Sequence, residues 1–136
     1  FLCFLHIPDR ERLLSVCRSA LRGGGGMYVE DFGRTREPSP VEADMLRVKV
    51  QCPYLPTSTG YEADLRTAGF DTISIHDVTQ DWTGFTVERL AQFRANRHRN
   101  ERVHGKDLVD GLDDFYATVS GLFVGGAISG LKIVAR

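Results

Sequence analysis

The sequence predicts an α/β fold, in which helices alternate along the chain with the strands of one sheet. An apolar run at residues 1–5 and a second apolar segment at 27–32 are predicted strands, and the segment between them has helical periodicity. Such a strand–helix–strand unit favours parallel strands joined by a right-handed crossover. A third strand is expected at 72–78, where Ile73 and Ile75 lie two residues apart, as on a half-buried strand.

The helices have recognisable ends. Asp9 is a favourable N-cap for the first helix, which we expect to end at the glycines 23–26, since glycine readily adopts the left-handed conformation at a helix C-terminus. Further helices are expected at 41–50, at 59–68 with the capping-box spacing of Thr59 and Glu62, at 84–99 and at 107–123. The last has the clearest amphipathic stripe, and a strand at 131–135 follows it. Two prolines make 51–56 irregular.

Composition narrows the class of protein without naming a chemistry. The chain has 136 residues, of which 42% are hydrophobic and 26% charged, as in an ordinary soluble domain or part of one. A net charge of -1 argues against bulk attraction to nucleic acid or to an anionic membrane. No apolar run approaches the roughly 20 residues of a membrane span. Three cysteines do not suggest a disulfide framework, so a reducing, cytoplasmic location is expected.

Three segments, in this order and spacing, carry a resemblance. The first is Phe4-Leu5-His6-Ile7-Pro8-Asp9 ahead of a helix, and the second runs from Leu21 through the four glycines to a strand ending in Asp31. The third is the helix from Tyr61, followed by Ala68-Gly69-Phe70 and the strand at 72–78. Together they resemble the class I S-adenosylmethionine-dependent methyltransferases. The closest resemblance is to the phosphoethanolamine and small-amine N-methyltransferases, which have a histidine at the position of His6 and an aromatic residue after the strand-end acid.

The resemblance implies a Rossmann-like methyltransferase fold truncated at its N-terminal side. Residues 1–136 would form the C-terminal portion of a single methyltransferase domain. Its mixed sheet would hold the fourth, fifth, seventh and sixth strands of the family in that order, at 1–5, 27–32, 131–135 and 72–78. The first three strands and the glycine-rich cofactor loop would lie upstream. Because the chain begins at Phe1 rather than methionine, we expect the natural protein to continue in that direction.

The resemblance also implies a function for the intact protein, namely methyl transfer from S-adenosylmethionine to a small-molecule acceptor, with an amine as one candidate. His6 would orient or deprotonate the acceptor, or it would simply be a helix-start histidine with a satisfied hydrogen bond. Asp31, Phe32 and Tyr54 would bind the substrate, with Phe32 beside a methylammonium group. Strand-end packing and core coverage are the structural alternatives for these three. The 136-residue chain alone is expected to be inactive.

Two departures from the phosphoethanolamine enzymes argue against a phosphobase substrate. The acid that those enzymes place four residues before the histidine is Leu2 in this chain. Their phosphate-gripping arginine–tyrosine pair has no secure counterpart around 51–54.

Other uses of the chain follow from particular segments. The glycines 23–26 follow a helix and precede a strand, the reverse of a phosphate-binding loop, so they are expected to be structural. A basic stretch at 89–106 suggests an RNA-associated protein, although a solvated helix face accounts for it as well. A non-catalytic interaction module retaining half of the fold is a further alternative. An apolar strand edge at 1–5 would favour self-association. No metal site is predicted.

Overall fold

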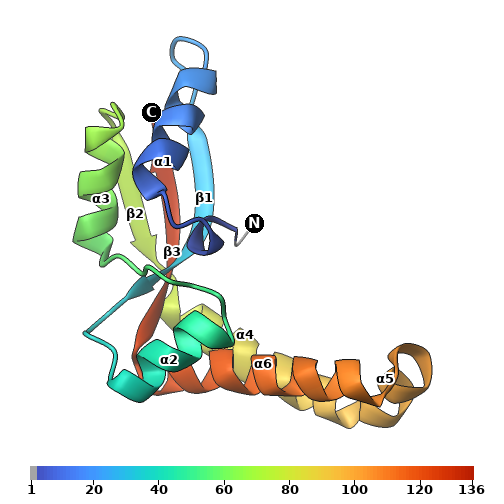
Figure 1. Cartoon of the computed structure of the whole chain (residues 1–136). Coiled ribbons are helices and arrows are strands. Elements are labelled where there is room, and N and C mark those ends of the chain that lie inside the picture. Colours follow the sequence, from blue (N-terminus) through green and yellow to red (C-terminus); the bar gives the residue numbers. More distant parts are fainter. Residues whose placement is uncertain (1–2) are drawn as a thin grey trace.

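The computed structural model describes residues 3–136 as an L-shaped molecule (Figure 1). One limb is a three-stranded sheet with helices against it, and the other is a long arm of helices. The strands are β1 (Met27–Arg34), β2 (Ile73–Asp77) and β3 (Ile128–Ala135). The helices are η1 (Phe4–His6, a 3₁₀ turn), α1 (Arg10–Ala20), α2 (Pro40–Val48), α3 (Ser58–Thr67), α4 (Thr79–Ala95), α5 (Arg97–His104) and α6 (Lys106–Val124).

The sheet has the order β1-β3-β2, and β3 is antiparallel to both of its neighbours. Ala135 at the end of β3 therefore lies opposite both Met27 and Ile73 at the starts of the flanking strands. This order is the one expected for the family's fifth, seventh and sixth strands. The predicted α/β fold is thus confirmed, and its last strand begins at Ile128, three residues earlier than expected. Within residues 3–136 the sheet has three strands and both pairings are antiparallel, so the four-stranded mixed sheet that was expected is not formed there.

Helices α1 and α3 cover one face of this sheet. Successive strand residues point to opposite faces, so Val29, Leu131 and Ile133 share the covered face, where each is at most 4% exposed. Leu14 of α1 and Leu65 of α3 complete this core with no exposed surface. The predicted N-cap of α1 is confirmed, because the Asp9 side chain accepts a hydrogen bond from the Arg12 N–H at 3.0 Å.

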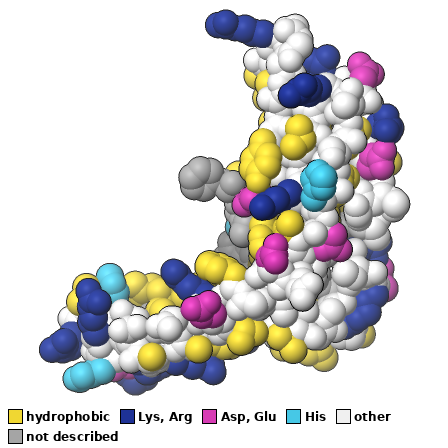
Figure 2. Space-filling model, turned by 180° about the vertical axis from the view of Figure 1, so that it is seen from behind, with side chains coloured by type: hydrophobic (Ala, Val, Ile, Leu, Met, Phe, Trp, Pro, Cys, Tyr) yellow, Lys and Arg dark blue, Asp and Glu magenta, His cyan; other side chains and the backbone are white. Residues whose placement is uncertain are grey.

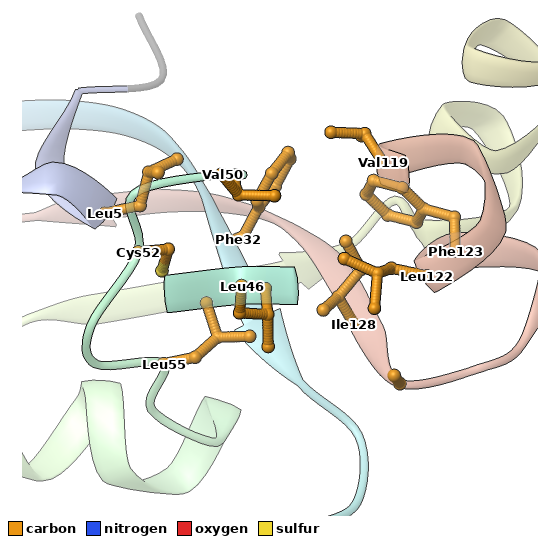
Figure 3. Close-up of a cluster of buried hydrophobic side chains, with 11 residues drawn as sticks. Leu5, Phe32, Leu46, Val50, Cys52, Leu55, Val119, Leu122, Phe123 and Ile128 are labelled. Atoms are coloured by element: carbon orange, nitrogen blue, oxygen red, sulfur yellow. The ribbon is translucent and has the colours of Figure 1, made fainter. Parts of the chain in front are cut away.

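A second core joins the sheet to the arm (Figure 3). Phe32 of β1 meets Leu122 and Phe123 at the end of α6, while Leu46 of α2 closes the cluster from the side. Leu5 of η1 belongs to the same cluster and is 3% exposed. Helix η1 near the N-terminus and the end of α6 at the base of the arm therefore pack into the same hydrophobic cluster as Phe32 of β1.

The strand expected at 1–5 is a wrong prediction where the structure describes it. Residues 1–2 lie outside the described part, and Phe4–His6 form a 3₁₀ turn closed by the hydrogen bonds from His6 N to Cys3 O and from Ile7 N to Phe4 O. A short apolar run signals burial without fixing a strand, and Leu5 obtains its burial by packing. Self-association through a strand edge has no basis at residues 3–6, although self-association itself stays a prediction.

Several helix ends differ from the expected ones because side chains cap them. Ser39 caps α2 and forms a capping box with Glu42, so this helix begins at Pro40. Thr57, and not Thr59, caps α3, accepting a hydrogen bond from the Gly60 N–H. The helix expected at 84–99 begins five residues earlier, at Thr79, and is divided from α5 at Asn96.

Acidification is expected to weaken the fold through Glu42. Its carboxylate accepts hydrogen bonds from Arg36 Nη1 at 2.8 Å and Nη2 at 2.6 Å, and from the Ser39 N–H at 2.8 Å. The Arg36 bonds, then those of Ser39, lower the pKa of Glu42 from 4.5 to about 2. A carboxyl group with a depressed folded-state pKa stabilises the fold above its unfolded pKa, and this stabilisation is lost as the pH falls from about 4.5 to about 2.

Urea unfolding at a series of pH values tests this expectation with the variant Glu42→Gln. The variant should flatten the fall in unfolding free energy between about pH 4.5 and pH 2. Glu62→Gln is the control, because Glu62 is a helix residue paired with Arg66. It should change the pH dependence of the unfolding free energy less than Glu42→Gln does. Identical slopes for Glu42→Gln and the wild-type chain would contradict the role of Glu42.

Candidate active site

A large cavity occupies the inner angle of the L, where the arm meets the sheet. Its volume is about 960 Å³. Hydrophobic side chains gather on the arm and at this angle in the view from behind (Figure 2). Most of the lining is aromatic and comes from β1, α4 and α6: Phe32, Trp82, Phe85, Phe115, Tyr116 and Phe123.

Three of these rings form a fixed cluster at the base of the cavity. The ring centroids of Phe32 and Trp82 are 5.9 Å apart, those of Phe32 and Phe123 are 5.3 Å apart, and those of Trp82 and Phe123 are 6.3 Å apart. All three pairs are edge-to-face, the arrangement that the ring quadrupoles favour. Gly130 of β3 leaves room for the indole, since a Cβ atom there would lie 2.6 Å from Trp82 Cε3.

Three charged residues also line the cavity, namely Glu30, Asp81 and Arg89. Glu30 accepts a hydrogen bond from the Tyr28 hydroxyl at 2.5 Å and lies 3.9 Å from Lys132 Nζ. Arg89 donates from Nη2 to the Tyr116 hydroxyl at 3.3 Å, and its guanidinium lies 5.3 Å from the centroid of that ring. The cavity therefore combines an apolar floor with a few polar groups, which is typical of small-molecule sites.

Asp31, predicted to bind substrate, points to the other face of the sheet. Its side chain has no exposed surface, and its Oδ2 accepts hydrogen bonds from Arg10 Nη1 at 2.9 Å and from the Tyr61 hydroxyl at 3.1 Å. Arg10 Nη1 also donates to the Tyr61 hydroxyl at 2.9 Å. Burial, and then the charge of Asp31, raise the pKa of Tyr61, so its hydroxyl stays protonated and can donate.

This buried triad leaves polar atoms without partners. Within residues 3–136, Arg10 Nε, Arg10 Nη2 and Asp31 Oδ1 are buried and accept or donate no hydrogen bond. Cys52 lies close enough to feel both charges, and burial is the main reason that its pKa rises to about 11. The thiol is therefore mainly protonated near neutral pH, so little of the nucleophilic thiolate is present.

The remaining predicted residues lie apart from one another. His6 is exposed on η1, with its Nδ1 3.2 Å from the Gln51 carbonyl oxygen. Tyr54 is 45% exposed and lines a second cavity of about 570 Å³ between α2 and the irregular segment that follows. Its ring centroid is 6.0 Å from the Arg10 guanidinium, which places Tyr54 above the buried triad. Of the four predicted residues, Phe32 alone lines the large cavity.

Known proteins share both the sequence pattern and the arrangement of elements. No model of a protein family matches the chain. The 27-O-demethylrifamycin SV methyltransferase of Amycolatopsis mediterranei is 33% identical over 85 residues, which are 57% of this chain and 31% of that protein. Phosphoethanolamine N-methyltransferase 2 of Haemonchus contortus, solved with phosphomonomethylethanolamine and S-adenosylhomocysteine, superposes with a TM-score of 0.85 at 18% identity, covering 98% of this chain and 31% of that one.

This is part of a methyltransferase fold. A third structure, of a proposed sarcosine dimethylglycine methyltransferase from Galdieria sulphuraria, has a TM-score of 0.86 at 12% identity and covers 99% of this chain and 50% of that one. The resemblance to methyltransferases inferred from the sequence is confirmed, and a phosphoethanolamine enzyme is among the solved structures that share this fold. The chain spans about a third of the length of the curated relative it matches.

The described residues do not form the cofactor loop of a methyltransferase fold. That loop joins a strand to the following helix and cradles the nucleoside with close backbone contacts. The glycine run of this chain lies between α1 and β1 instead, and a Cβ atom at Gly23 or Gly24 would meet nothing within 4 Å. Gly24 has a φ of +75°, as a turn requires. The run is thus an open turn that offers no cradle. It does not cap the helix as expected, because α1 already ends at Ala20, with Leu21 in an extended conformation as its C-cap.

The basic stretch at 89–106 is partly neutralised by acids of the arm. Arg94 Nε lies 2.8 Å from Asp113 Oδ1 on α6, and Arg97 Nε lies 2.9 Å from Glu101 Oε1. Asp110 accepts hydrogen bonds from both Arg97 and Lys106. This pairing is consistent with the solvated-helix interpretation, and RNA binding by the stretch stays a prediction.

Two further absences concern the described residues alone. No helix in residues 3–136 is both long and apolar enough to cross a membrane. The same part of the chain has no cluster of three histidine, cysteine, aspartate or glutamate side chains that could hold a metal ion.

Sequence reasoning missed most of the cavity. The apolar stripe of the helix at 107–123 was expected to pack into a core. Part of it does, but three of its residues also line the cavity, namely Phe115, Tyr116 and Phe123. Trp82 lay outside the predicted elements, because the helix that contains it was expected to begin at residue 84. The single tryptophan of the chain, four residues after the predicted strand at 72–78, was a signal that could have pointed to the cavity.

Proposed function

We propose that the intact protein transfers a methyl group from S-adenosylmethionine to a small-molecule acceptor held in the aromatic cavity. The main support is the cavity of about 960 Å³ at the inner angle of a methyltransferase fold, with Phe32, Trp82 and Phe123 at its base. The similar proteins are methyltransferases or were solved with S-adenosylmethionine or S-adenosylhomocysteine, which supports this methyl donor. Since the described residues lack the cofactor loop, their part is to bind and orient the acceptor.

Each predicted residue has a defined part in this proposal. Phe32 packs against the acceptor as part of the cavity floor, where an aromatic face also suits a methylammonium group. His6 is exposed, and its ring keeps one nitrogen beside the Gln51 carbonyl. The other nitrogen is then available to orient or deprotonate an acceptor. Asp31 and Tyr54 act with Arg10 as a positioning group behind β1, since the Asp31 carboxylate is fully buried.

An amine is one acceptor that this arrangement supports. Electron-rich ring faces attract alkylammonium groups, and the carboxylates of Glu30 and Asp81 also line the cavity. Methyl transfer by in-line displacement mainly requires the nucleophile to be aligned with the methyl sulfonium. A rigid aromatic floor provides such alignment for either an amine or a hydroxyl group.

Replacing His6 with alanine tests the proposal in the full-length protein. We expect the rate of S-adenosylhomocysteine formation to fall about 100-fold or more, the usual contribution of a general base. The first acceptors to test are 27-O-demethylrifamycin SV and phosphomonomethylethanolamine, which the similar proteins name. His104→Ala, at the far end of α5, is the matched control. A His6→Ala rate equal to that of the control would remove the catalytic role of His6.

The 136-residue chain by itself is expected to be inactive and to bind the cofactor weakly. Titration calorimetry with S-adenosylhomocysteine should give a Kd no tighter than about 1 mM, a binding free energy of about -4 kcal/mol. Micromolar binding by this chain would show that its own residues hold the nucleoside.

A further inference from the structure

We propose that the cavity recognises a bulky, ring-bearing acceptor, and that Arg89 binds an anionic oxygen group, such as a carboxylate, on that acceptor. This inference rests on the proposed function, because it takes the cavity to be the acceptor site. It concerns the body of the acceptor and leaves the methylated atom open.

The size and lining of the cavity indicate the bulk of the acceptor. Sites for drug-sized molecules are typically about 300–1,000 Å³, and the volume of about 960 Å³ is at the upper end of that range. A small amine alone would leave most of this space to water against apolar walls. Phe85 on α4 is 63% exposed although it lines the cavity, so a fused or extended ring system would cover apolar surface that is open to water.

Arg89 is the one arginine or lysine among the described residues that line the cavity. Arg94, Arg97 and Lys106 each lie within ion-pair distance of an acid on α5 or α6. Arg89 has no such partner in residues 3–136, although it lies only five residues from Arg94 on the same helix. Arg99 and Arg102 on α5 also lack an ion pair in this part of the chain, so what distinguishes Arg89 is its place in the cavity lining, where it has no carboxylate partner.

The surroundings of Arg89 orient it for a ligand. Its guanidinium lies 5.3 Å from the centroid of the Tyr116 ring, and Nη2 donates to the Tyr116 hydroxyl at 3.3 Å. Both residues line the cavity. Tyr116 is fixed in turn by Phe93, whose ring centroid is 5.0 Å away. The remaining donors of the guanidinium form a planar fork that matches a carboxylate.

The two acids of the cavity do not satisfy this cation. Glu30 is bound by Tyr28 and approached by Lys132. Asp81 lies in the first turn of α4, where the helix dipole stabilises a negative charge. Eight residues separate Asp81 from Arg89, about 12 Å along a helix. The cavity therefore has a cationic end and an acidic end, and an elongated ring-bearing ligand with one anionic group fits this polarity.

Two fluorescent probes test the inference on the 136-residue chain. The probes are 8-anilinonaphthalene-1-sulfonate and N-phenyl-1-naphthylamine, which share one ring system and differ by the sulfonate. Trp82 is the single tryptophan and lines the cavity, so a probe bound there quenches its emission, and the variants locate the binding site. The variants are Arg89→Gln, Arg89→Lys and, as the matched control from the second cavity, Arg47→Gln.

Both probes should quench Trp82 in the wild-type chain. Arg89→Gln should raise the Kd of the sulfonate probe about fivefold to tenfold, as expected for the loss of a charge-assisted contact at a partly exposed site. It should change the binding of the neutral probe less than about twofold, while Arg89→Lys should lose less than Arg89→Gln because it keeps the charge. Arg47→Gln should leave both probes unchanged. Circular dichroism of the Arg89 variants checks that this exposed change keeps the fold.

Three results would overturn the inference. The first is that neither probe quenches Trp82. The second is that Arg89→Gln weakens the binding of both probes by the same factor. The third is that Arg47→Gln weakens the binding of the sulfonate probe as much as Arg89→Gln does. The assay contains no methyl donor, so its outcome is independent of catalysis. A correct probe pattern, with no formation of S-adenosylhomocysteine by the full-length protein, would refute the proposed function and keep the anion site. Methyl transfer by the full-length protein without the probe pattern would do the opposite.

Discussion

Replacing Arg10 with methionine is expected to lower the free energy of unfolding by about 3–5 kcal/mol, the usual cost of removing one partner of a buried ion pair. Arg10 and Asp31 are 6% and 0% exposed, and their charged atoms are 2.9 Å apart. Without Arg10, the Asp31 carboxylate keeps one hydrogen bond, from Tyr61, inside an apolar core. Desolvation of that charge is then no longer offset by an opposite charge. Urea denaturation of the variant and the wild-type chain measures the difference.

Two further variants separate the ion pair from general effects of the substitution. Arg12→Met changes an exposed arginine on the same helix and is expected to alter stability by no more than about 0.5 kcal/mol. The double variant Arg10→Met/Asp31→Leu removes both charges and should recover much of the loss, since apolar replacements of buried pairs are often neutral. A single variant Arg10→Met as stable as Arg12→Met would show that the buried pair does not stabilise the fold.

The order of the elements could be predicted because it depends on local signals. Asp9 placed the start of α1, and the alternation of Ile73 and Ile75 placed β2. The apolar run at 1–5 misled because burial is all that such a run indicates, and Leu5 obtains it in a 3₁₀ turn. The start of α2 at Pro40, one residue before the expected 41, was within reach of the sequence, because Ser39 and Glu42 have the spacing of a capping box.

The site was harder to predict because its contacts are distant along the chain. Asp31 and Phe32 were expected to act together, yet consecutive strand residues face opposite sides, so Asp31 meets the helices and Phe32 the cavity. Arg10 is 21 residues from Asp31 and 51 from Tyr61. No local sequence pattern predicts that Arg10, Asp31 and Tyr61 come together. The cavity, likewise, exists only because α4 and α6 pair into an arm that projects from the sheet (Figure 1).

The second large effect is expected at Gly130, where the sheet gives way to the cavity. Gly130→Ala would place a Cβ atom 2.6 Å from Trp82 Cε3 and 2.7 Å from Cδ2, far inside van der Waals contact. The indole is packed against Phe32 and Phe123, so it cannot move without disturbing the aromatic floor. We expect a loss of about 1–3 kcal/mol, as for other overpacked cores. The emission of Trp82, the single tryptophan, should shift to longer wavelength as the ring moves toward water.

Gly111→Ala is the control for this prediction, because a Cβ atom at that position of α6 meets nothing within 4 Å. It should raise stability by about 0.5–1 kcal/mol through the better helix propensity of alanine, with no change in Trp82 emission. If Gly130→Ala is stable but loses affinity for N-phenyl-1-naphthylamine, the aromatic floor shapes the cavity without bracing the fold. If it changes neither stability, emission nor probe binding, Trp82 does not lie against β3 as described, and the cavity floor would have to be assigned to other residues.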